Sequence, residues 1–502
     1  MAWSSNRFTI QKSNLDLFAL KSLVLLDFIM KQKIVLFWFR QDLRLLDNPG
    51  LSYAAKFGNV LPIYILDDQN SGMQKMGGAS RFWLHHSLYS LRASLKGHLS
   101  VYQGDPKSVF NDLLNRYEVQ GVFWNRCYEP WRIQRDKTLK NYLKSLPIQT
   151  RTFNASLLWE PWDIQKKDGK PYTVFSPFYR KGCLKAETPR EPLPRVVQLK
   201  SVYDPSELGI DSLNLLPNNR WDVQLETHWE IGENAAHNRY QEFIKEGLSN
   251  YKEGRNLPAT PCVSRLSPYI HFGEISPNYI WHEVQSLGSN KNIDHFCSEL
   301  GWREFSYSQL YYNPDLPDKN LQSKFDSFPW RKDSKNLRKW QKGITGIPMV
   351  DAGMRELWQT GYMHNRSRMI VGSFLVKNLL IHWHHGEQWF WDTLIDADLA
   401  NNSASWQWTA GCGADAATYF RIFNPVIQGL KLDPEGSYVR KFIPEIASLP
   451  NEYLFSPWDA PVEILDKAGI QLGLTYPNPI VDLNQSRDTA QEAFQLLEEV
   501  SL

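Results

Sequence analysis

Residues 34–40, IVLFWFR, are the first of five apolar runs that alternate with helical patterns between residues 33 and 154. The later runs span 60–68, 99–103, 121–125 and 150–153. Nearly continuous apolar character is typical of parallel strands that are buried on both faces. Strand–helix alternation at this spacing indicates βαβ units with right-handed crossovers. We therefore predict a Rossmann-like α/β domain at 33–165, although no GxGxxG fingerprint follows its first strand.

Downstream of this domain the pattern changes twice. Prolines accumulate between residues 187 and 219, where periodicity fades, and this is typical of a surface linker. From about Trp229 to Leu497 helical periodicity dominates. A chain of 502 residues is long enough to bury two hydrophobic cores. We predict a linker at 166–228 and an all-helical domain at 229–497.

The first residues differ in character from the rest. Residues 15–30 are apolar in places but carry Asp16, Lys21 and Asp27, so they are too short and too charged to span a membrane. We expect 1–32 to be a disordered leader or the product of a mis-assigned start. The five cysteines are scattered without a CxxC pair, which favours free thiols in the cytoplasm. We further expect a monomer without a membrane partner.

Charge and composition permit a nucleic-acid partner but do not require one. The net charge is only +2, which allows DNA binding if the basic residues gather on one face. The chain has 20 Trp, far above ordinary usage. These indoles either pack large cores or serve stacking and redox chemistry, and composition alone leaves both interpretations open.

The segment 396–408, DADLANNSASWQW, combines polar groups and indoles in an unusual way. Taken as one helix, it places Asp398, Asn402 and Trp406 at i, i+4 and i+8, on a single face. A face that packs in a core rarely combines a carboxylate with an amide, because each buried polar group needs a partner. Trp408 would lie roughly 200° round the helix from Trp406.

Two other segments carry polar groups at helical spacing. In 361–369, GYMHNRSRM, Asn365 and Met369 share a face, and Arg366 taken alone is better explained as part of a solvated basic face. In 299–305, ELGWREF, Glu299 and Trp302 are i, i+3 neighbours. Neither segment is specific alone.

Taken together, these segments resemble the photolyase/cryptochrome family over about residues 33–497. The resemblance rests on FWFRQDLRLLDNPGL (37–51), SRLSPYIHFGEISP (264–277), ELGWREF (299–305), TGIPMVDAGMREL (345–357), GYMHNRSRM (361–369), DADLANNSASWQW (396–408) and YFRIFNPVIQG (419–429). It implies an amino-terminal α/β antenna domain and a carboxy-terminal helical domain that binds FAD. The activity it implies is light-driven repair of cyclobutane pyrimidine dimers in DNA.

The resemblance implies FAD contacts at twelve positions: Tyr251, Ser264, Arg265, Leu266, Ser267, Phe296, Arg303, Arg368, Asp396, Ala397, Asp398 and Asn402. Asn402 would lie against the N5 edge of the flavin, and Asp396 would pair with Arg368. The segment GCGADA (411–416) looks like GxGxxA, but it follows a Trp-rich helix rather than a strand. We therefore do not interpret it as a dinucleotide site.

The resemblance also implies a repair site and a DNA surface. Trp302 and Trp408 would flank a flipped dimer by stacking, and Glu299 would hydrogen-bond its bases. The implied catalytic set is Glu299, Asn365, Met369, Asn402, Trp302 and Trp408. The implied DNA contacts are Arg255, Glu299, Trp302, Asn365, Arg366, Trp408 and Gln428.

Three further tryptophans, Trp406, Trp383 and Trp330, match a relay that carries electrons from the surface to oxidised flavin. The amino-terminal domain holds an antenna pigment in many relatives. Here YEPWR (128–132) departs from the Asn-Glu pattern of folate-binding bacterial members. We rank methenyltetrahydrofolate before a deazaflavin as the antenna, and the absence of any antenna stays open.

Other functions compete with dimer repair. Enzymes that repair the (6-4) photoproduct place a histidine pair where this chain has Asn365 and Met369. Signalling cryptochromes usually carry a long carboxy-terminal tail, whereas the family pattern here runs to about Leu497 of 502 residues. His382, His384 and His385 cluster in sequence, but adjacent histidines on a helix cannot converge on one ion, so we expect no metal. We expect repair rather than signalling.

Overall fold

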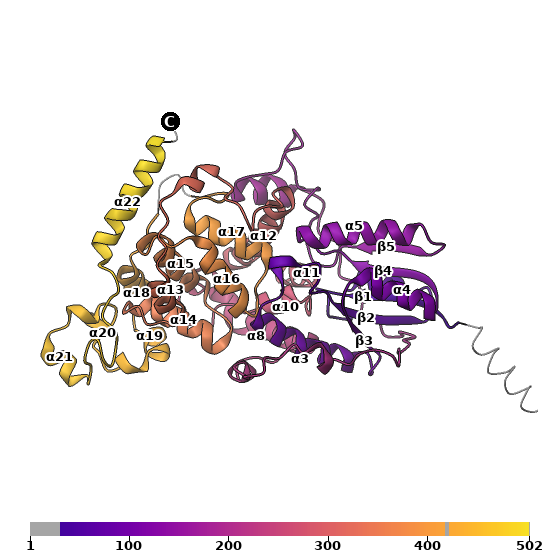
Figure 1. Cartoon of the computed structure of the whole chain (residues 1–502), viewed down its shortest axis with the longest axis horizontal. Coiled ribbons are helices and arrows are strands. Elements are labelled where there is room, and N and C mark those ends of the chain that lie inside the picture. The colour runs from indigo at the N-terminus through magenta and orange to yellow at the C-terminus, as the bar shows by residue number, and fades with distance from the viewer. Residues whose placement is uncertain (1–30, 417–420, 501–502) are drawn as a thin grey trace, which may run out of the picture.

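The computed structural model describes residues 31–416 and 421–500 (Figure 1). Most of the predicted leader, 1–32, lies outside the described residues. Figure 1 shows an α/β region at one end of the molecule and a larger helical region at the other. This confirms the predicted fold class. Among the described residues, no helix is both long enough and apolar enough to cross a membrane.

The α/β region is built on one parallel sheet. Its strands are β1 (Lys33–Phe39), β2 (Val60–Leu66), β3 (Ser100–Gln103), β4 (Glu118–Asn125) and β5 (Gln149–Phe153). They lie in the order β3-β2-β1-β4-β5, and every neighbouring pair is parallel. In the central strand, Phe37 is in register with Pro62 on one side and Phe123 on the other. All five predicted runs are therefore strands.

The two faces of the sheet belong to different cores. Val35, Phe37 and Phe39 of β1 join a core that continues into the helical region. Trp38 and its even-numbered neighbours join a smaller core, which helices of the α/β region complete. Side chains alternate between the faces of a strand, so one apolar run contributes to both cores. The sheet is thereby fixed to the helical domain through one of its faces.

The helices fall into three groups. Those of the α/β region are α2 (Pro49–Ala54), η1 (Gly72–Gln74), α3 (Gly78–Ser94), α4 (Pro106–Arg116) and α5 (Pro130–Lys144). Those between the regions are α6 (Phe175–Pro177), η2 (Phe178–Gly182), η3 (Cys183–Lys185), η4 (Asp211–Leu213) and α7 (Val223–Glu226). Those of the helical region are α8 (Glu233–Glu242), η5 (Phe243–Gly247), η6 (Leu248–Asn250), α9 (Tyr251–Gly254), α10 (Ser267–His271), α11 (Pro277–Ser286), α12 (Lys291–Tyr312), η7 (Ser323–Ser327), α13 (Ser334–Gln341), α14 (Pro348–Thr360), α15 (Asn365–Ser373), η8 (Phe374–Asn378), α16 (Trp383–Thr393), α17 (Leu399–Ala410), α18 (Pro425–Leu432), α19 (Ser437–Phe442), η9 (Pro444–Ile446), α20 (Asn451–Leu454), η10 (Pro457–Asp459), α21 (Val462–Lys467) and α22 (Leu483–Val500).

The segment between the two regions lies against the sheet. The Val60 amide donates to the Lys200 carbonyl over 2.8 Å, and the Val202 amide donates to the Val60 carbonyl over 2.8 Å. Only short helices interrupt this segment. The predicted linker bounds, 166–228, and the domain bounds that depend on them stay a prediction.

A buried carboxyl lies where the two regions meet. Glu274, in the helical region, accepts a hydrogen bond from the indole nitrogen of Trp83 on α3 over 3.1 Å. Glu274 is fully buried, and burial raises the pKa of its carboxyl to about 8. The junction therefore contains a carboxyl that keeps its proton at neutral pH.

The carboxy-terminal segment around Tyr476 packs against α14, although the two are far apart in the sequence. The Tyr476 hydroxyl donates to Asp351 of α14 over 2.8 Å, and Asp351 also accepts hydrogen bonds from Thr345 and Gly346. Gly346 has a φ of 77°, and a Cβ at this position would lie 2.4 Å from backbone atoms of Asn478. The two segments approach too closely for any other residue here.

Candidate active site

A cavity of about 720 Å³ lies among α9, α10, α12, α15 and α17 of the helical region. Its walls contain every residue that we predicted as a catalytic group or as an FAD contact. Arg255 and Arg366, two of the predicted DNA contacts, also line it, whereas Gln428 on α18 and the outer relay residues Trp383 and Trp330 do not. Sites for cofactors and drug-sized ligands commonly enclose about 300–1,000 Å³. The cavity therefore has the size for a large cofactor.

The helix expected at 396–408 begins later than predicted. α17 starts at Leu399, and Asp398 is its N-cap with extended backbone dihedrals. The Asp398 carboxylate accepts hydrogen bonds from the Asn401 amide over 2.9 Å, from Tyr307 and from His271. Hydrogen-bond competition explains the difference, because a carboxylate is more stable capping free backbone amides than inside a helix.

The same contacts determine the charge of Asp398. Burial opposes ionisation of its carboxyl. The hydrogen bonds from His271 and Tyr307, together with the positive charge of Arg303, overcome this effect and hold the pKa of Asp398 below its usual value. Asp398 is therefore an anion in the cavity wall. Asn402 and Trp406 follow it on α17, and both are buried at the cavity.

The expected pair of Asp396 and Arg368 is present. One guanidinium nitrogen of Arg368 lies 2.8 and 3.0 Å from the two carboxylate oxygens of Asp396. Ser267 donates a further hydrogen bond to Asp396 over 2.6 Å. The pair joins α10, α15 and the turn before α17, so it fixes three walls of the cavity relative to one another.

Glu299 of α12 faces the cavity beside a cation. Its carboxylate lies 2.8 Å from the Arg255 guanidinium. Burial raises the pKa of the Glu299 carboxyl, while Arg255 and Arg366 oppose this shift. Glu299 therefore combines a buried carboxyl with two neighbouring cations, Arg255 and Arg366, in the cavity wall.

The two predicted stacking indoles have different surroundings. Trp302 lies flat against Phe175, with ring centroids 3.8 Å apart and planes 11° from parallel. One face of the Trp302 indole is therefore covered by protein. Trp408 on α17 is half-buried and lines the same cavity as Trp302. Both rings are available to a planar ligand within one space.

α15 brings Asn365 and Met369 to the cavity, one helical turn apart. Arg366, beside them, is half-buried, and its side chain donates to Asn256 over 2.9 Å. The solvated basic face favoured for Arg366 by sequence alone is therefore wrong. His364 caps this helix, and burial together with Arg255, Arg366 and other cations lowers the pKa of its imidazole to about 3.

The three relay tryptophans run from the cavity toward the surface. Trp406 lines the cavity, Trp383 is fully buried, and Trp330 is half-buried. The His382 ring bridges the outer pair, with its centroid 5.6 Å from that of Trp383 and 5.1 Å from that of Trp330. Of the three, the outermost residue in the predicted order, Trp330, is the most exposed, and the two inner indoles are buried.

Sequence reasoning missed three residues around this cavity. His271 and Tyr307 hold Asp398, and Phe175 covers Trp302. His271 stands within the quoted motif 264–277, where a histidine could have been tested as a partner for a carboxylate. No local pattern marks Phe175, because it belongs to the segment between the two regions.

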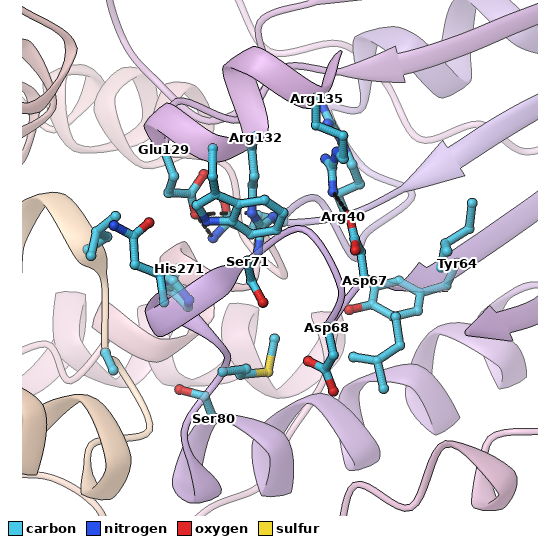
Figure 2. Close-up of a pocket in the computed structure, with 18 of the residues that line it drawn as sticks. Arg40, Tyr64, Asp67, Asp68, Ser71, Ser80, Glu129, Arg132, Arg135 and His271 are labelled. Carbon is cyan, nitrogen blue, oxygen red and sulfur yellow. Dashed lines mark hydrogen bonds and ion pairs between the residues drawn. The ribbon is translucent and has the colours of Figure 1, made fainter. Parts of the chain in front are cut away.

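A second pocket lies at the carboxyl ends of the parallel strands (Figure 2). Its open volume is about 50 Å³, since its own side chains occupy most of it. The Arg135 guanidinium lies between the rings of Trp38 and Trp131, 4.8 and 5.0 Å from their centroids. It also forms an ion pair with Asp67 over 3.0 Å. Ligands of open α/β sheets bind at this edge.

The two pockets meet at one residue. His271 lines both of them, and its imidazole forms a hydrogen bond with Asp398 over 3.2 Å. No group of three His, Cys, Asp or Glu side chains suited to a metal ion occurs within 31–416 and 421–500. The available chemistry is that of charged pairs, amides and aromatic rings.

Known proteins resemble this chain along nearly its whole length. Residues 35–197 match the model of DNA photolyase, and residues 296–496 match the FAD-binding domain of DNA photolyase. The chain is 44% identical to the deoxyribodipyrimidine photo-lyase of Agrobacterium fabrum, over 93% of this chain and 98% of the relative. It is 36% identical to Cryptochrome-2 of Arabidopsis thaliana, over 94% and 80%. A bacterial class III photolyase from Agrobacterium tumefaciens superimposes with a TM-score of 0.90 at 43% identity, over 94% and 98%.

Proposed function

Because this chain belongs to the DNA photolyase family, we propose that it repairs cyclobutane pyrimidine dimers in DNA under blue light. One observation carries the proposal: the indoles of Trp302 and Trp408 and the carboxyl of Glu299 face the cavity that also holds the expected FAD contacts. FAD bound there in its reduced form supplies, on excitation, the electron that opens the cyclobutane ring.

The FAD contacts fit the donor set of the cavity. Arg303 and Arg368 supply cations, Ser264 and Ser267 supply hydroxyls, and Asn402 supplies an amide. The Asn402 side chain donates to the Glu387 carbonyl over 3.0 Å, so the direction of its amide is fixed. Phosphate groups and a flavin edge require these kinds of partners. We propose that these residues hold FAD.

Each lesion contact has a distinct role. Trp302 and Trp408 stack on the flipped pyrimidines, and such stacking is worth about 1–3 kcal/mol per base. Glu299, whose pKa is raised, donates a hydrogen bond to a base carbonyl when it holds its proton. Asn365 and Met369 complete the wall. Arg255, Arg366 and Gln428 contact the DNA strand.

The three tryptophans form the route by which oxidised flavin regains an electron. Trp406 gives an electron to the flavin first and is left with an electron vacancy, or hole. The hole then passes to Trp383 and on to Trp330 near the surface. The greater exposure of Trp330 than of the two buried inner indoles supports this direction. In Trp330→Phe, photoreduction should be slower, while repair by protein that has been reduced beforehand should proceed as before.

An antenna pigment is a separate proposal. The pocket of Figure 2 stands at the edge of the sheet where such ligands bind. Its open volume of about 50 Å³ means that Trp131 or Arg135 must move before a folate or deazaflavin could enter. A monomeric state and a cytoplasmic location also stay predictions.

One light-dependent assay tests the main proposal. Purified protein with bound FAD is reduced, mixed with an oligonucleotide that contains a thymine dimer, and either illuminated with blue light or kept dark. We expect loss of the dimer only in the light. Dimers that stay intact in the illuminated sample would contradict repair.

A signalling cryptochrome is the second candidate, because the similarity to Cryptochrome-2 covers 94% of this chain. This function predicts light-driven flavin reduction without repair of any lesion. Repair of the (6-4) photoproduct alone would contradict both functions, and Asn365 and Met369 stand where that chemistry requires histidines. Testing both lesions side by side separates these three outcomes.

A further inference from the structure

A cluster of basic residues follows Trp330, the outer end of the tryptophan chain, in the sequence. We call it the basic patch, and it consists of Arg331, Lys332, Lys335, Arg338, Lys339 and Lys342. One carboxylate, Asp333, interrupts it. Every member except Lys339, which is half-buried, is exposed, and none forms an ion pair with a carboxylate of the described residues. The patch therefore presents uncompensated positive charge to solvent.

α13 displays the patch on a fixed face. Lys335, Lys339 and Lys342 follow one another at i, i+4 and i+7, so they point the same way. On the opposite face, Trp340 is fully buried and its ring lies 6.2 Å from that of Trp406. This anchoring fixes the orientation of α13, with Lys335 and Lys342 exposed and Lys339 half-buried.

The patch is joined directly to Trp330. The Arg331 amide donates to the Leu380 carbonyl over 2.7 Å, which pins the start of the patch to the segment before α16. Trp330, the preceding residue, contacts His382 and through it Trp383. Arg331 and Lys332, both exposed, directly follow the half-buried Trp330 in the chain.

We propose that the basic patch docks an acidic one-electron carrier protein, which reduces Trp330. The proposal rests on the relay of the proposed function. One electron leaves the reduced centre of the carrier and fills the hole on the Trp330 indole, so the carrier is oxidised by one electron. That hole has already moved outward from Trp406 through Trp383, and the flavin has gained the matching electron. No bond forms or breaks.

Charge and position together favour an electron carrier over DNA. A nucleic acid would bind the patch wherever it lay on the protein. No member of the patch lines the cavity, which has cations of its own in Arg255 and Arg366. The basic patch lies next to the end of the relay in the chain. This position matters only to a partner that exchanges electrons. Opposite charge would steer such a partner and raise its rate of encounter.

Two reduced c-type cytochromes, one acidic and one basic on its surface, provide matched probes. Neither reduces flavin in the dark, and haem oxidation under blue light reports each electron delivered. With the full chain and oxidised FAD at low salt, we expect the acidic cytochrome to be oxidised faster. In K335E/K339E that rate should fall about tenfold, and salt should remove the difference. K137E/K144E, which reverses two exposed lysines of α5, should match the parent protein.

A carbodiimide that joins lysine amines to carboxylates gives a readout that does not depend on light. Mass spectrometry should find Lys335 or Lys339 linked to the acidic cytochrome. Equal oxidation of both cytochromes by the parent protein would overturn the proposal, as would an unchanged rate in K335E/K339E. A loss of affinity for undamaged duplex in that variant, with cytochrome oxidation intact, would identify the patch as a DNA surface and also overturn it.

Dithiothreitol, a small neutral reductant, separates this proposal from the relay. With dithiothreitol as the electron donor, the rate of flavin photoreduction should be equal in K335E/K339E and in the parent protein. The same rate should be lower in Trp330→Phe. If Trp330→Phe behaves as the parent does with dithiothreitol, the relay itself is wrong. If Trp330→Phe is slower with dithiothreitol but the two cytochromes are oxidised equally fast, the relay stands and the proposed docking surface is wrong.

Discussion

The cavity of the helical region and the pocket of the α/β region contain the same kinds of side chains but very different amounts of space. Both combine arginines, aspartates and tryptophans, yet one encloses about 720 Å³ and the other about 50 Å³. In the small pocket, Arg135 lies between two indoles and pairs with Asp67, so its groups satisfy one another. In the large cavity, Trp302 and Trp408 keep open faces. Residue type alone therefore does not identify a binding site.

The largest difference between the pockets should appear when one arginine is removed from each. Arg368→Met leaves Asp396 buried with a single remaining donor, Ser267, and loss of one member of a buried pair costs about 3–5 kcal/mol. We expect bound flavin to be lost as well. Arg135→Met should cost less, because Asp67 keeps the amides of Gln69 and Asn70. Urea denaturation and flavin absorbance measure both effects, and equal costs with flavin retained in each variant would remove the distinction.

Removing one indole from each pocket tests which rings bind the lesion. Trp408→Ala should weaken affinity for dimer-containing DNA by about 1–3 kcal/mol, because one stacking surface is lost. Flavin content should not change. Trp131→Ala in the small pocket is the matched control and should leave lesion affinity as it was. Fluorescence anisotropy with a dimer-containing oligonucleotide gives the affinities, and flavin loss in Trp408→Ala would count against the assignment.

The junction between the two regions should respond to pH. Glu274 has its folded pKa raised to about 8 by burial, whereas the unfolded chain releases this proton near the ordinary value of 4.5. Between these values unfolding releases a proton, so the free energy of unfolding should decrease as pH rises, by at most about 1.4 kcal/mol per pH unit. Glu274→Gln should flatten this slope from about pH 5 to 8. Denaturation at several pH values measures this slope. An unchanged slope in Glu274→Gln would mean that another group causes the pH dependence.

The smallest effect is expected at Gln428, the predicted DNA contact that lies outside the cavity. Gln428→Ala should lower DNA affinity by about fivefold or less, because a single neutral hydrogen bond at a surface contributes about 1 kcal/mol or less. Arg255→Ala, at the cavity, should have the larger effect and should reduce the salt dependence of binding. If Gln428→Ala proves as severe as Arg255→Ala, the DNA contacts extend well beyond the cavity.

The fold was predictable where a single segment carries its own signal. Residues 34–40 read as a buried strand because their apolar character is continuous, and β1 lies there. The start of α17 was not predictable, since the 3.6-residue period fits Asp398 equally well inside a helix or at its cap. His271 and Tyr307, which the fold brings close from far along the chain, add hydrogen bonds that stabilise Asp398 at the cap.

The site followed a similar rule. Motif residues such as Glu299 and Asn402 were found because the resemblance fixes each of them by position. Phe175 was missed because its contact with Trp302 joins residues far apart in the chain, and no local pattern encodes such a pair. The closed state of the small pocket was equally hidden, because it depends on the conformations that Trp131 and Arg135 adopt together.

The hydrogen bond between Tyr476 and Asp351 has a consequence for the order in which the protein is made. Asp351 emerges from the ribosome 125 residues before the tyrosine that completes its set of donors. In the complete fold, burial raises the pKa of the Asp351 carboxyl to about 6, although the hydrogen bonds from Thr345 and Tyr476 oppose this shift. The set of donors around Asp351 is therefore complete only after Tyr476 has been synthesised, near the carboxy-terminal end of the helical domain.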